Sequence, residues 1–458
     1  MLLSLSTLAS PSTLSRLNFF PKPPSLFSAL STFRRNQLPL KSSFTETKRD
    51  GDVVVLGIET SCDDTAAAVV RSDGEILSQV VSSQADLLVK YGGVAPKMAE
   101  EAHSQAVQEA LDKAYLTEKD LTAVAVTIGP GLSLCLRAIL VVWANQKAGV
   151  GLQLNLFSFF AGGFNLPIIG IHNMEAHALV ARLIEKDLQF PFMALLISGG
   201  HNVLVLARDL GQYIQLGTTI DNAIGEAYDK TAKWLGLDLR RSGGPAIEKL
   251  AMEGNAESVK FSVNCNFSYA GLKTQVRLEI ESKMIDAKIP ISSASNEDRL
   301  SRADIAASFQ RIAVLHLEER CERAILWAFK MEPSIRHLVV SGGVASNQYV
   351  RARLHYGQGF WIQSMEDGGK NGLQLVCPPP LLCTDNGVMI AWTGIEHFRM
   401  GRYDPPPPAE EPEDFLYDIR PRWPLGEEYA EGKSVARSLR TARIHPSLTS
   451  VIQASLQQ

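Results

Sequence analysis

The segment IGIHNMEAHALVARL, residues 169–183, places His172, Asn173, Glu175 and His177 where an apolar strand is predicted to pass into a helix. Two histidines beside a carboxylate are typical of a metal site, but ligands on one helix share a face when they are four residues apart. His172 and His177 are five residues apart. Asn173, which does share a face with His177, is a poor ligand for transition metals. The pattern therefore indicates a metal site, a metal site that has lost a ligand, or neither.

A further acidic residue, Asp385 in CTDNG, lies between a proline-rich loop and the predicted helix GVMIAWTGIEHF. Asp385 or the neighbouring Thr384 is well suited to cap the start of that helix. Asp385 could equally be a third metal ligand beside the histidines. The spacing leaves both interpretations open.

Short glycine turns follow several predicted strands, in ISGGH, SGGPAIE and SGGVASN, and acids at 59, 63 and 64 follow the strand of GIETSCDDT. Glycine allows backbone N–H groups to approach phosphate oxygens closely. Several such turns together favour a phosphate-binding cleft. The P-loop and Rossmann glycine patterns are both absent.

Strands that alternate with helices must position these residues, and this alternation predicts an α/β architecture. Strand–turn–strand patterns begin near residues 53 and 193, and a long helix is predicted over 303–329. The two similar openings predict two related lobes with a cleft between them.

Bulk composition limits the class of protein. The chain of 458 residues is 45% hydrophobic and 21% charged, with a net charge of −4 and six cysteines that form no CxxC pair. It can bury a large core, it is not a generally basic nucleic-acid coat, and its cysteines indicate neither a disulfide framework nor a zinc knuckle. The most apolar window, 138–160, is interrupted by polar residues, so no transmembrane span is predicted.

The first fifty residues are rich in Ser, Leu and Pro, carry seven Lys or Arg residues, and contain no acid before Glu46. This composition is typical of an organelle transit peptide. Arg34 and Arg35 favour the mitochondrion, with the plastid as the alternative. The tail from residue 421 is predicted to be loosely ordered.

Seven motifs in one order, between about Val53 and Ile395, resemble the tRNA threonylcarbamoyladenosine transferase family, formerly described as O-sialoglycoprotein endopeptidases. They are GIETSCDDT, GPGLSLCLR, HNMEAH, LLISGGH, GEAYDKTAKWLGL, SGGPAIE and GGVASN…CTDNGVMIAWTG. The resemblance implies an α/β, actin-like ATPase fold with two ribonuclease-H-like lobes around a nucleotide cleft. It places the N-terminal lobe at 51–190, with 385–420 returning to it, and the C-terminal lobe at 191–384.

The resemblance also implies an acyltransferase reaction: threonylcarbamoyl passes from threonylcarbamoyl-adenylate to N6 of adenosine 37 in tRNAs that read ANN codons, and AMP is released. Its implied partners are the tRNA anticodon loop, the enzyme that makes the adenylate, and a second subunit in a homodimer. It leaves open a peripheral association with the inner membrane. One divalent metal ion per subunit, iron or zinc, is the implied cofactor.

Residue roles follow from the matching motifs. Glu59 and Asp63 would be catalytic, with Asp63 facing the metal and phosphates, and the metal ligands would be His177, Asp385 and the residue at position 173. The substrate-binding residues implied in this way are Leu196, Ile197, Ser198, Gly199, Gly200, Asp229, Gly244, Glu248, Ser346, Asn347 and Thr384.

Three features depart from the family pattern. The family has histidine where this chain has Asn173, so the block reads as a metal site with one ligand replaced. The segments 138–160 and 355–372 do not match, which indicates either a mis-spliced or misassembled sequence or a diverged paralogue. A non-catalytic nucleotide-binding protein is therefore an alternative. A metallopeptidase is disfavoured, because Glu175 lies only two residues before His177 and HExxH is absent.

Overall fold

The computed structural model describes residues 53–61, 64–82, 106–138, 165–239, 242–261, 268–363, 373–406 and 418–429. All of them belong to one compact unit, Lys48–Gln458. The predicted leader 1–50, the candidate Asp63, and residues 139–160, 364–372 and 430–458 of the segments named above lie outside the described residues.

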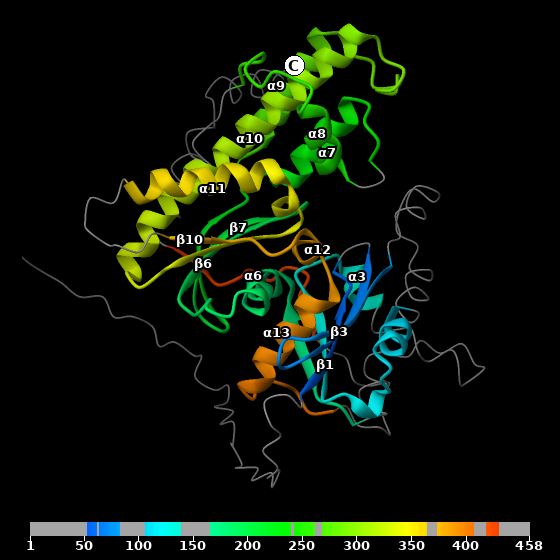
Figure 1. Ribbon diagram of the computed structural model, residues 1–458, viewed down its shortest axis with the longest axis vertical. Coiled ribbons are helices and arrows are strands. Elements are labelled where there is room, and N and C mark those ends of the chain that lie inside the picture. Colours follow the sequence, from blue (N-terminus) through cyan, green and yellow to red (C-terminus); the bar gives the residue numbers. More distant parts are fainter. Residues whose placement is uncertain are drawn as a thin grey trace, which may run out of the picture. The chain divides into compact units, whose positions relative to one another are not determined.

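The first of two sheets formed by the described residues has the strand order β3-β2-β1-β4-β5 (Figure 1). The strands are β1 (Val54–Glu59), β2 (Thr65–Arg71), β3 (Ile76–Ser82), β4 (Ala123–Gly129) and β5 (Ile168–His172). β1, β2 and β3 are antiparallel neighbours, whereas β4 and β5 run parallel to β1. The register of β1 and β4 pairs Ile58 with Val126, so Glu59 and Thr127 emerge side by side.

The second sheet has the order β10-β9-β6-β7-β8-β11. Its strands are β6 (Phe192–Ile197), β7 (Asn202–Asp209), β8 (Gln212–Thr218), β9 (His337–Ser341), β10 (Gln374–Val376) and β11 (Glu427–Glu428). β6, β7 and β8 are antiparallel neighbours, and β9 and β10 run parallel to β6. Apart from the short edge strand β11, this repeats the first sheet. The predicted α/β fold of two related lobes, the actin-like class, is confirmed.

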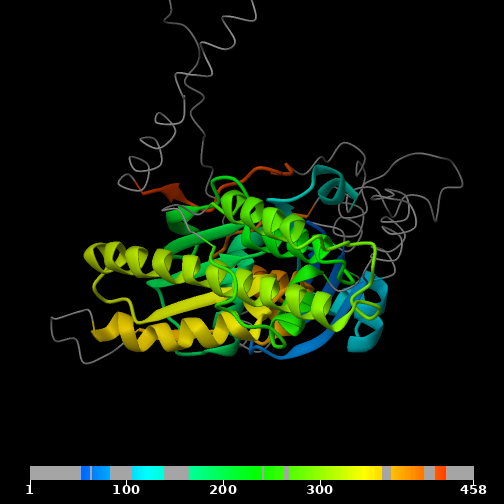
Figure 2. The same ribbon diagram turned by 90° about the horizontal axis from the view of Figure 1, so that it is seen from above.

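Helices cover the sheets on their apolar faces. Their bounds are α3 (Ser133–Ala138), α6 (Asn173–Ile184), α7 (Ile224–Trp234), α8 (Gly243–Ala251), α9 (Ala270–Ser282), α10 (Asn296–Met331), α11 (Gln348–Gln363), α12 (Pro380–Cys383) and α13 (Gly387–Arg399), with the 3₁₀ turns η1 (Glu118–Asp120) and η3 (Gly343–Ser346). One core packs α7 to α11 against the second sheet, and α10 and α11 run alongside each other (Figure 2). Another core packs α6 and α13 against the first sheet.

The long helix α10 begins seven residues before the predicted start at 303. Ser295 caps it by accepting a hydrogen bond from the backbone nitrogen of Asp298 at 3.2 Å. Glu297 and Asp298 then lie in the first turn, where negative charge favours the helix dipole. Polar residues 296–302 thus extend the helix beyond its apolar pattern.

Close backbone contact joins α13 to the centre of the first sheet. A Cβ atom at Gly57 on β1 would lie 2.3 Å from the backbone nitrogen of Ala391, and one at Gly387 would lie 2.5 Å from the backbone of Ala67. Only glycine permits this approach. It places Asp385, two residues before α13, near Glu59 at the end of β1.

Gly57→Val is expected to destabilise the protein by about 3 kcal/mol, because the added atoms must displace rigid backbone rather than a flexible side chain. The free energy of urea unfolding is the measurement. Gly271→Val is a matched control, since a Cβ there would meet nothing within 4 Å. Equal stability of the two variants would contradict the close packing of α13 on β1.

Among the described residues, no helix has the length and apolar character needed to cross a membrane.

Candidate active site

His172 caps α6 through one ring nitrogen and contacts Trp423 through the other. Nδ1 accepts hydrogen bonds from the backbone nitrogens of Met174 at 3.1 Å and Glu175 at 3.4 Å, which requires Nε2 to carry the proton. Nε2 lies 3.0 Å from the backbone oxygen of Trp423 and donates to it. Burial lowers the pKa of His172 to about 4, so the ring is neutral near pH 7. His172 therefore has no nitrogen left for a metal ion.

Asn173 and His177 lie on one face of α6, and both side chains meet the same oxygen of Asp385. Asn173 Nδ2 is 3.1 Å and His177 Nε2 is 3.0 Å from Asp385 Oδ1. Loss of water contact alone would raise the pKa of Asp385, but hydrogen bonds from His177 and Asn173 outweigh it and lower the pKa. Asp385 is therefore a carboxylate near neutral pH.

The cap of α13 is Asn386, whose Oδ1 accepts from the backbone nitrogen of Met389 at 2.8 Å. Its Nδ2 donates to the backbone oxygen of Thr384 at 2.8 Å. The interpretation of Asp385 or Thr384 as the helix cap is therefore wrong. Because Asn386 serves the helix, the carboxylate of Asp385 is directed to α6, with 39% of the side chain still exposed.

A buried carboxylate, Glu59, lies behind Asn173. Its Oε1 accepts from the backbone nitrogen of Ser61 at 2.6 Å, and its Oε2 accepts from Asn173 Nδ2 at 3.2 Å and from the hydroxyl of Thr127. Burial, and then the nearby charge of Asp385, raise the pKa of Glu59 above its usual value. Asn173 thus donates to two carboxylates from one amide nitrogen.

These side chains do not fit the three-ligand transition-metal centre that the resemblance implies. His177 and Asp385 are good ligands, but position 173 presents an amide N–H to Asp385. Within the described part of the chain, no three His, Cys, Asp or Glu residues are grouped to hold a metal ion. His177 Nδ1 is buried without a hydrogen-bond partner among the described residues.

The turn after β6 borders the same carboxylate. Burial lowers the pKa of His201, the charge of Asp385 opposes that shift, and the charge of His177 adds to it. Ser198 holds the turn, because its Oγ accepts from the backbone nitrogen of His201 at 3.1 Å. Cβ atoms at Gly199 and Gly200 would meet nothing within 4 Å, so the turn has open space in front of it.

The side chains of Leu196 and Ile197, just before this turn, are fully buried in the second sheet. The backbone of both residues is covered as well, and contact of either with the substrate stays a prediction.

The other predicted substrate-binding residues form a second group, on α7, α8 and η3. Asp229 accepts from the backbone nitrogen of Gly243 at 2.6 Å, and burial raises its pKa. Glu248 accepts from the backbone nitrogen of Gln348 at 2.6 Å, at the start of α11. A Cβ at Gly244 would meet nothing within 4 Å, so this position also faces open space.

η3 provides the rest of this group. Asn347 is buried; its Oδ1 accepts from the backbone nitrogen of Val350 at 3.0 Å and its Nδ2 donates to Gln310 at 3.2 Å. The hydroxyl of Ser346 donates to the backbone oxygen of Gly343 at 2.6 Å. Both side chains therefore have internal structural contacts, while Thr384 is exposed.

Sequence reasoning did not single out Ser61, Thr127 or His201. Thr127 is a lone hydroxyl in the apolar strand AVAVTIG, and such a residue opposite an acid on a neighbouring strand is a usable signal. Ser61 and His201 lay within quoted motifs but had no assigned role. Their position beside Asn173 and Asp385 becomes evident only once the strands are placed.

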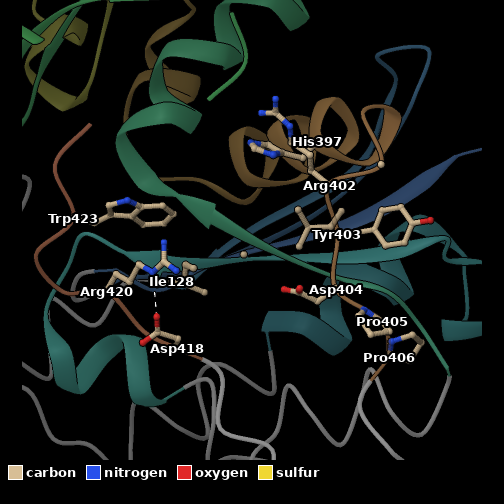
Figure 3. Close-up of a pocket in the computed structure, with 13 residues that line it drawn as sticks. Ile128, His397, Arg402, Tyr403, Asp404, Pro405, Pro406, Asp418, Arg420 and Trp423 are labelled. Carbon is tan, nitrogen blue, oxygen red and sulfur yellow. Dashed lines mark hydrogen bonds and ion pairs between the residues drawn. The ribbon is translucent and has the colours of Figure 1, made fainter. Parts of the chain in front are cut away.

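A separate pocket of about 770 Å³ lies at the C-terminal end of α13 and contains no predicted site residue (Figure 3). Trp423 and Tyr403 flank it, and His397 lies at its edge. Arg420 pairs with Asp418 at 3.2 Å, and its guanidinium lies 4.7 Å from the centre of the Trp423 ring.

Comparison with known proteins gives concordant matches. Residues 75–392 match the family model described as tRNA N6-adenosine threonylcarbamoyltransferase. A protein of Arabidopsis thaliana named probable tRNA N6-adenosine threonylcarbamoyltransferase, mitochondrial, is 71% identical over 420 residues, covering 89% of this chain and 82% of its own length.

More distant relatives carry related names. The mitochondrial tRNA N6-adenosine threonylcarbamoyltransferase of Xenopus tropicalis is 41% identical, over 76% of this chain and 83% of its own. The tRNA N6-adenosine threonylcarbamoyltransferase of Rhizobium etli is 43% identical, over 81% of this chain and 94% of its own. Among solved structures, component A of (R)-2-hydroxyglutaryl-CoA dehydratase from Acidaminococcus fermentans aligns with a TM-score of 0.42 at 13% identity, over 75% of this chain and 98% of that one.

Proposed function

The chain belongs to the tRNA N6-adenosine threonylcarbamoyltransferase family, and from this premise we propose that it forms threonylcarbamoyladenosine at position 37 of mitochondrial tRNAs that read ANN codons. The donor is threonylcarbamoyl-adenylate, and AMP is the product that leaves. The observation that carries the proposal is 71% identity over 89% of the chain to a relative named as a mitochondrial enzyme of this activity. The transit-like leader supports an organelle, and the arginine pair Arg34–Arg35 together with the name of this relative supports the mitochondrion.

In the reaction, N6 of adenosine attacks the carbamoyl carbonyl carbon, the bond from that carbon to the phosphate oxygen breaks, and N6 loses a proton. An aromatic amine is a weak nucleophile, so the carbonyl must be held and polarised. Backbone N–H groups of the turns at Gly199, Gly200 and Gly244 are suited to hold phosphate oxygens, because open space lies before each of them.

Asp385, which borders the turn after β6 and has 39% of its side chain exposed, would receive the N6 proton, directly or through water. Its lowered pKa keeps it able to accept a proton near pH 7. Glu59 would act indirectly: it accepts a hydrogen bond from Asn173 and so holds that side chain in place. Asp63, predicted to face the phosphates, stays a prediction.

For the implied divalent ion, iron or zinc, one per subunit, His177 and Asp385 are the two strong ligands and Asn173 a weak one. We therefore expect weak metal binding, and no step above depends on the metal. The anticodon loop presents adenosine 37 unpaired, so the enzyme need not open a duplex. The homodimer, the enzyme that supplies the adenylate and a peripheral membrane association remain proposals from the resemblance.

A catalytically impaired, nucleotide-binding paralogue is the second candidate, and the Asn173 amide is the observation that favours it. Depletion of the protein followed by measurement of threonylcarbamoyladenosine in mitochondrial tRNA separates the two. Loss of the modification, restored by the intact chain, is expected. Unchanged modification would favour the paralogue.

Removal of residues 1–50 is expected to leave a folded protein that binds AMP, because every described element lies after this segment. Circular-dichroism melting and AMP titration of the truncated protein are the measurements. Residues 1–50 fused to a fluorescent reporter should direct it to mitochondria. A truncated protein that does not fold, or a reporter that stays outside organelles, would contradict the transit-peptide prediction.

A further inference from the structure

Helix α6 carries Asn173 and His177 and is packed between the two sheets. Ala176 and Val180 belong to the core shared with α13 and the first sheet. Ala178 and Ala181 belong to the core shared with β6, β7 and β9 of the second sheet. Met174, Leu179 and Leu183 of α6 are also buried in these cores and hold the helix by packing. Apolar contacts are not directional, so hydrogen bonds to buried groups are the contacts that define the rotation of α6 most sharply.

Glu175 makes such contacts from a buried position. Its Oε1 accepts from the hydroxyl of Tyr213 at 2.8 Å and from the backbone nitrogen of Gly211 at 3.1 Å, both in the β7–β8 hairpin. Its Oε2 lies 3.0 Å from Nε2 of His397 on α13. One carboxylate thus joins α6 to the second sheet and to α13.

The side chain at position 175 points away from the face of Asn173 and His177, because two residues correspond to about 200° around a helix. Both halves of the Asn173–His177–Asp385 cluster depend on the helices that Glu175 connects. α6 carries the first two residues, and Asp385 directly precedes α13. A rotation of α6 would carry His177 Nε2 away from Asp385, now at 3.0 Å.

We propose that Glu175 is a positioning residue, which fixes the rotation of α6 relative to α13 so that Asn173 and His177 meet Asp385. Hydrogen bonds to a buried carboxylate are directional and strong, so they can define the angle of the helix more closely than its apolar contacts do. The proposal rests on the assignment of the Asn173–His177–Asp385 cluster to the active site. Its test is made independent of transferase activity.

The test compares Glu175→Gln with Glu396→Gln in the full chain. Glu396 also joins α6 to α13, through Arg182 at 2.8 Å, but near the far end of α6. Histidine labelled with ¹⁵N reports the ring nitrogens of His177, assigned through a His177→Gln variant. The Nε2 signal of His177 is expected to shift markedly in Glu175→Gln and to stay near its wild-type position in Glu396→Gln.

A second measurement uses Zn²⁺ titration in the Asn173→His background. Glu175→Gln is expected to weaken Zn²⁺ binding about 10-fold or more, as loss of a group that orients metal ligands does. AMP affinity should stay unchanged, because the glycine turn after β6 does not contact Glu175. Tyr213→Phe, which removes one of the hydrogen bonds, should give a smaller loss of Zn²⁺ affinity.

Urea unfolding establishes how much stability each variant loses. A folded Glu175→Gln protein with unchanged His177 signals and unchanged Zn²⁺ affinity would overturn the proposal. So would equal effects of Glu175→Gln and Glu396→Gln on His177, which would show that any contact between α6 and α13 suffices. If the wild-type chain itself does not modify tRNA while His177 responds to Glu175→Gln as expected, the proposed function is wrong and the positioning role stands.

Discussion

Asn173→His is expected to raise the affinity of the site for Zn²⁺ by at least about 100-fold, since loss of an outer partner of a metal ligand alone costs roughly 10–100-fold. An imidazole binds transition metals well, whereas an amide oxygen is a neutral, weak donor. Asn173 and His177 already converge on one oxygen of Asp385, at 3.1 and 3.0 Å. Histidine at 173 would complete a set of two imidazoles and a carboxylate.

The substitution should not unfold the protein. Glu59 would lose the hydrogen bond from Asn173 but would keep those from the Ser61 backbone and the Thr127 hydroxyl. The buried carboxylate would therefore still have donors, and only a modest loss of stability is expected. Urea unfolding of both proteins checks this.

The matched control is His172→Asn. Asparagine is among the best helix caps, so it can accept from the start of α6 in place of His172 Nδ1 while removing the imidazole. Metal content of this variant should equal that of the wild type. Equal metal content in wild type and Asn173→His would refute the placement of the site, as would complete loss of metal in His172→Asn.

The fold could be predicted from the sequence because its elements are local patterns. FMALLISGGHNVLVLA reads as two strands around a glycine turn, and it forms β6 and β7 with Ser198 and His201 closing the turn. The repeat of strand–turn–strand openings likewise predicted two related sheets. Apolar periodicity determines such elements, and neighbouring residues are enough to reveal it.

The start of α13 shows what local pattern cannot decide. Thr384, Asp385 and Asn386 are all good helix caps by residue type. Asn386 caps the helix in the structure, and Asp385 instead meets His177, which is more than 200 residues away in the chain. A single sequence does not show which residues so far apart in the chain meet in the folded protein.

The same limit applies to residues that could either stabilise the fold or contact the ligand. The motifs predict that Glu248 and Asn347 bind the substrate, and the structure shows them holding the start of α11. A residue that stabilises the wall of a cleft matches the motif as well as one that contacts the ligand. Asn347→Ala would therefore be a poor test of nucleotide binding, because it would leave Gln310 without its buried partner.

Gly199→Val avoids this difficulty, and it is expected to weaken AMP binding by at least about 10-fold, or roughly 1.4 kcal/mol. The branched side chain would fill the space before the turn where backbone N–H groups are proposed to meet the phosphate. A Cβ at Gly199 meets nothing within 4 Å, so the fold has room for it. The loss of affinity would therefore come from the ligand and not from unfolding.

Isothermal titration with AMP, beside urea unfolding, measures the two effects separately. Gly271→Val on α9 is the control, since it adds the same side chain where a Cβ also meets nothing within 4 Å and no ligand is proposed. It should bind AMP as the wild type does. Folded Gly199→Val protein with wild-type AMP affinity would show that the phosphate lies elsewhere, and the turn after β6 would then have to be removed from the site. Reduced affinity in Gly199→Val alone would place the phosphate at the turn that borders Asp385.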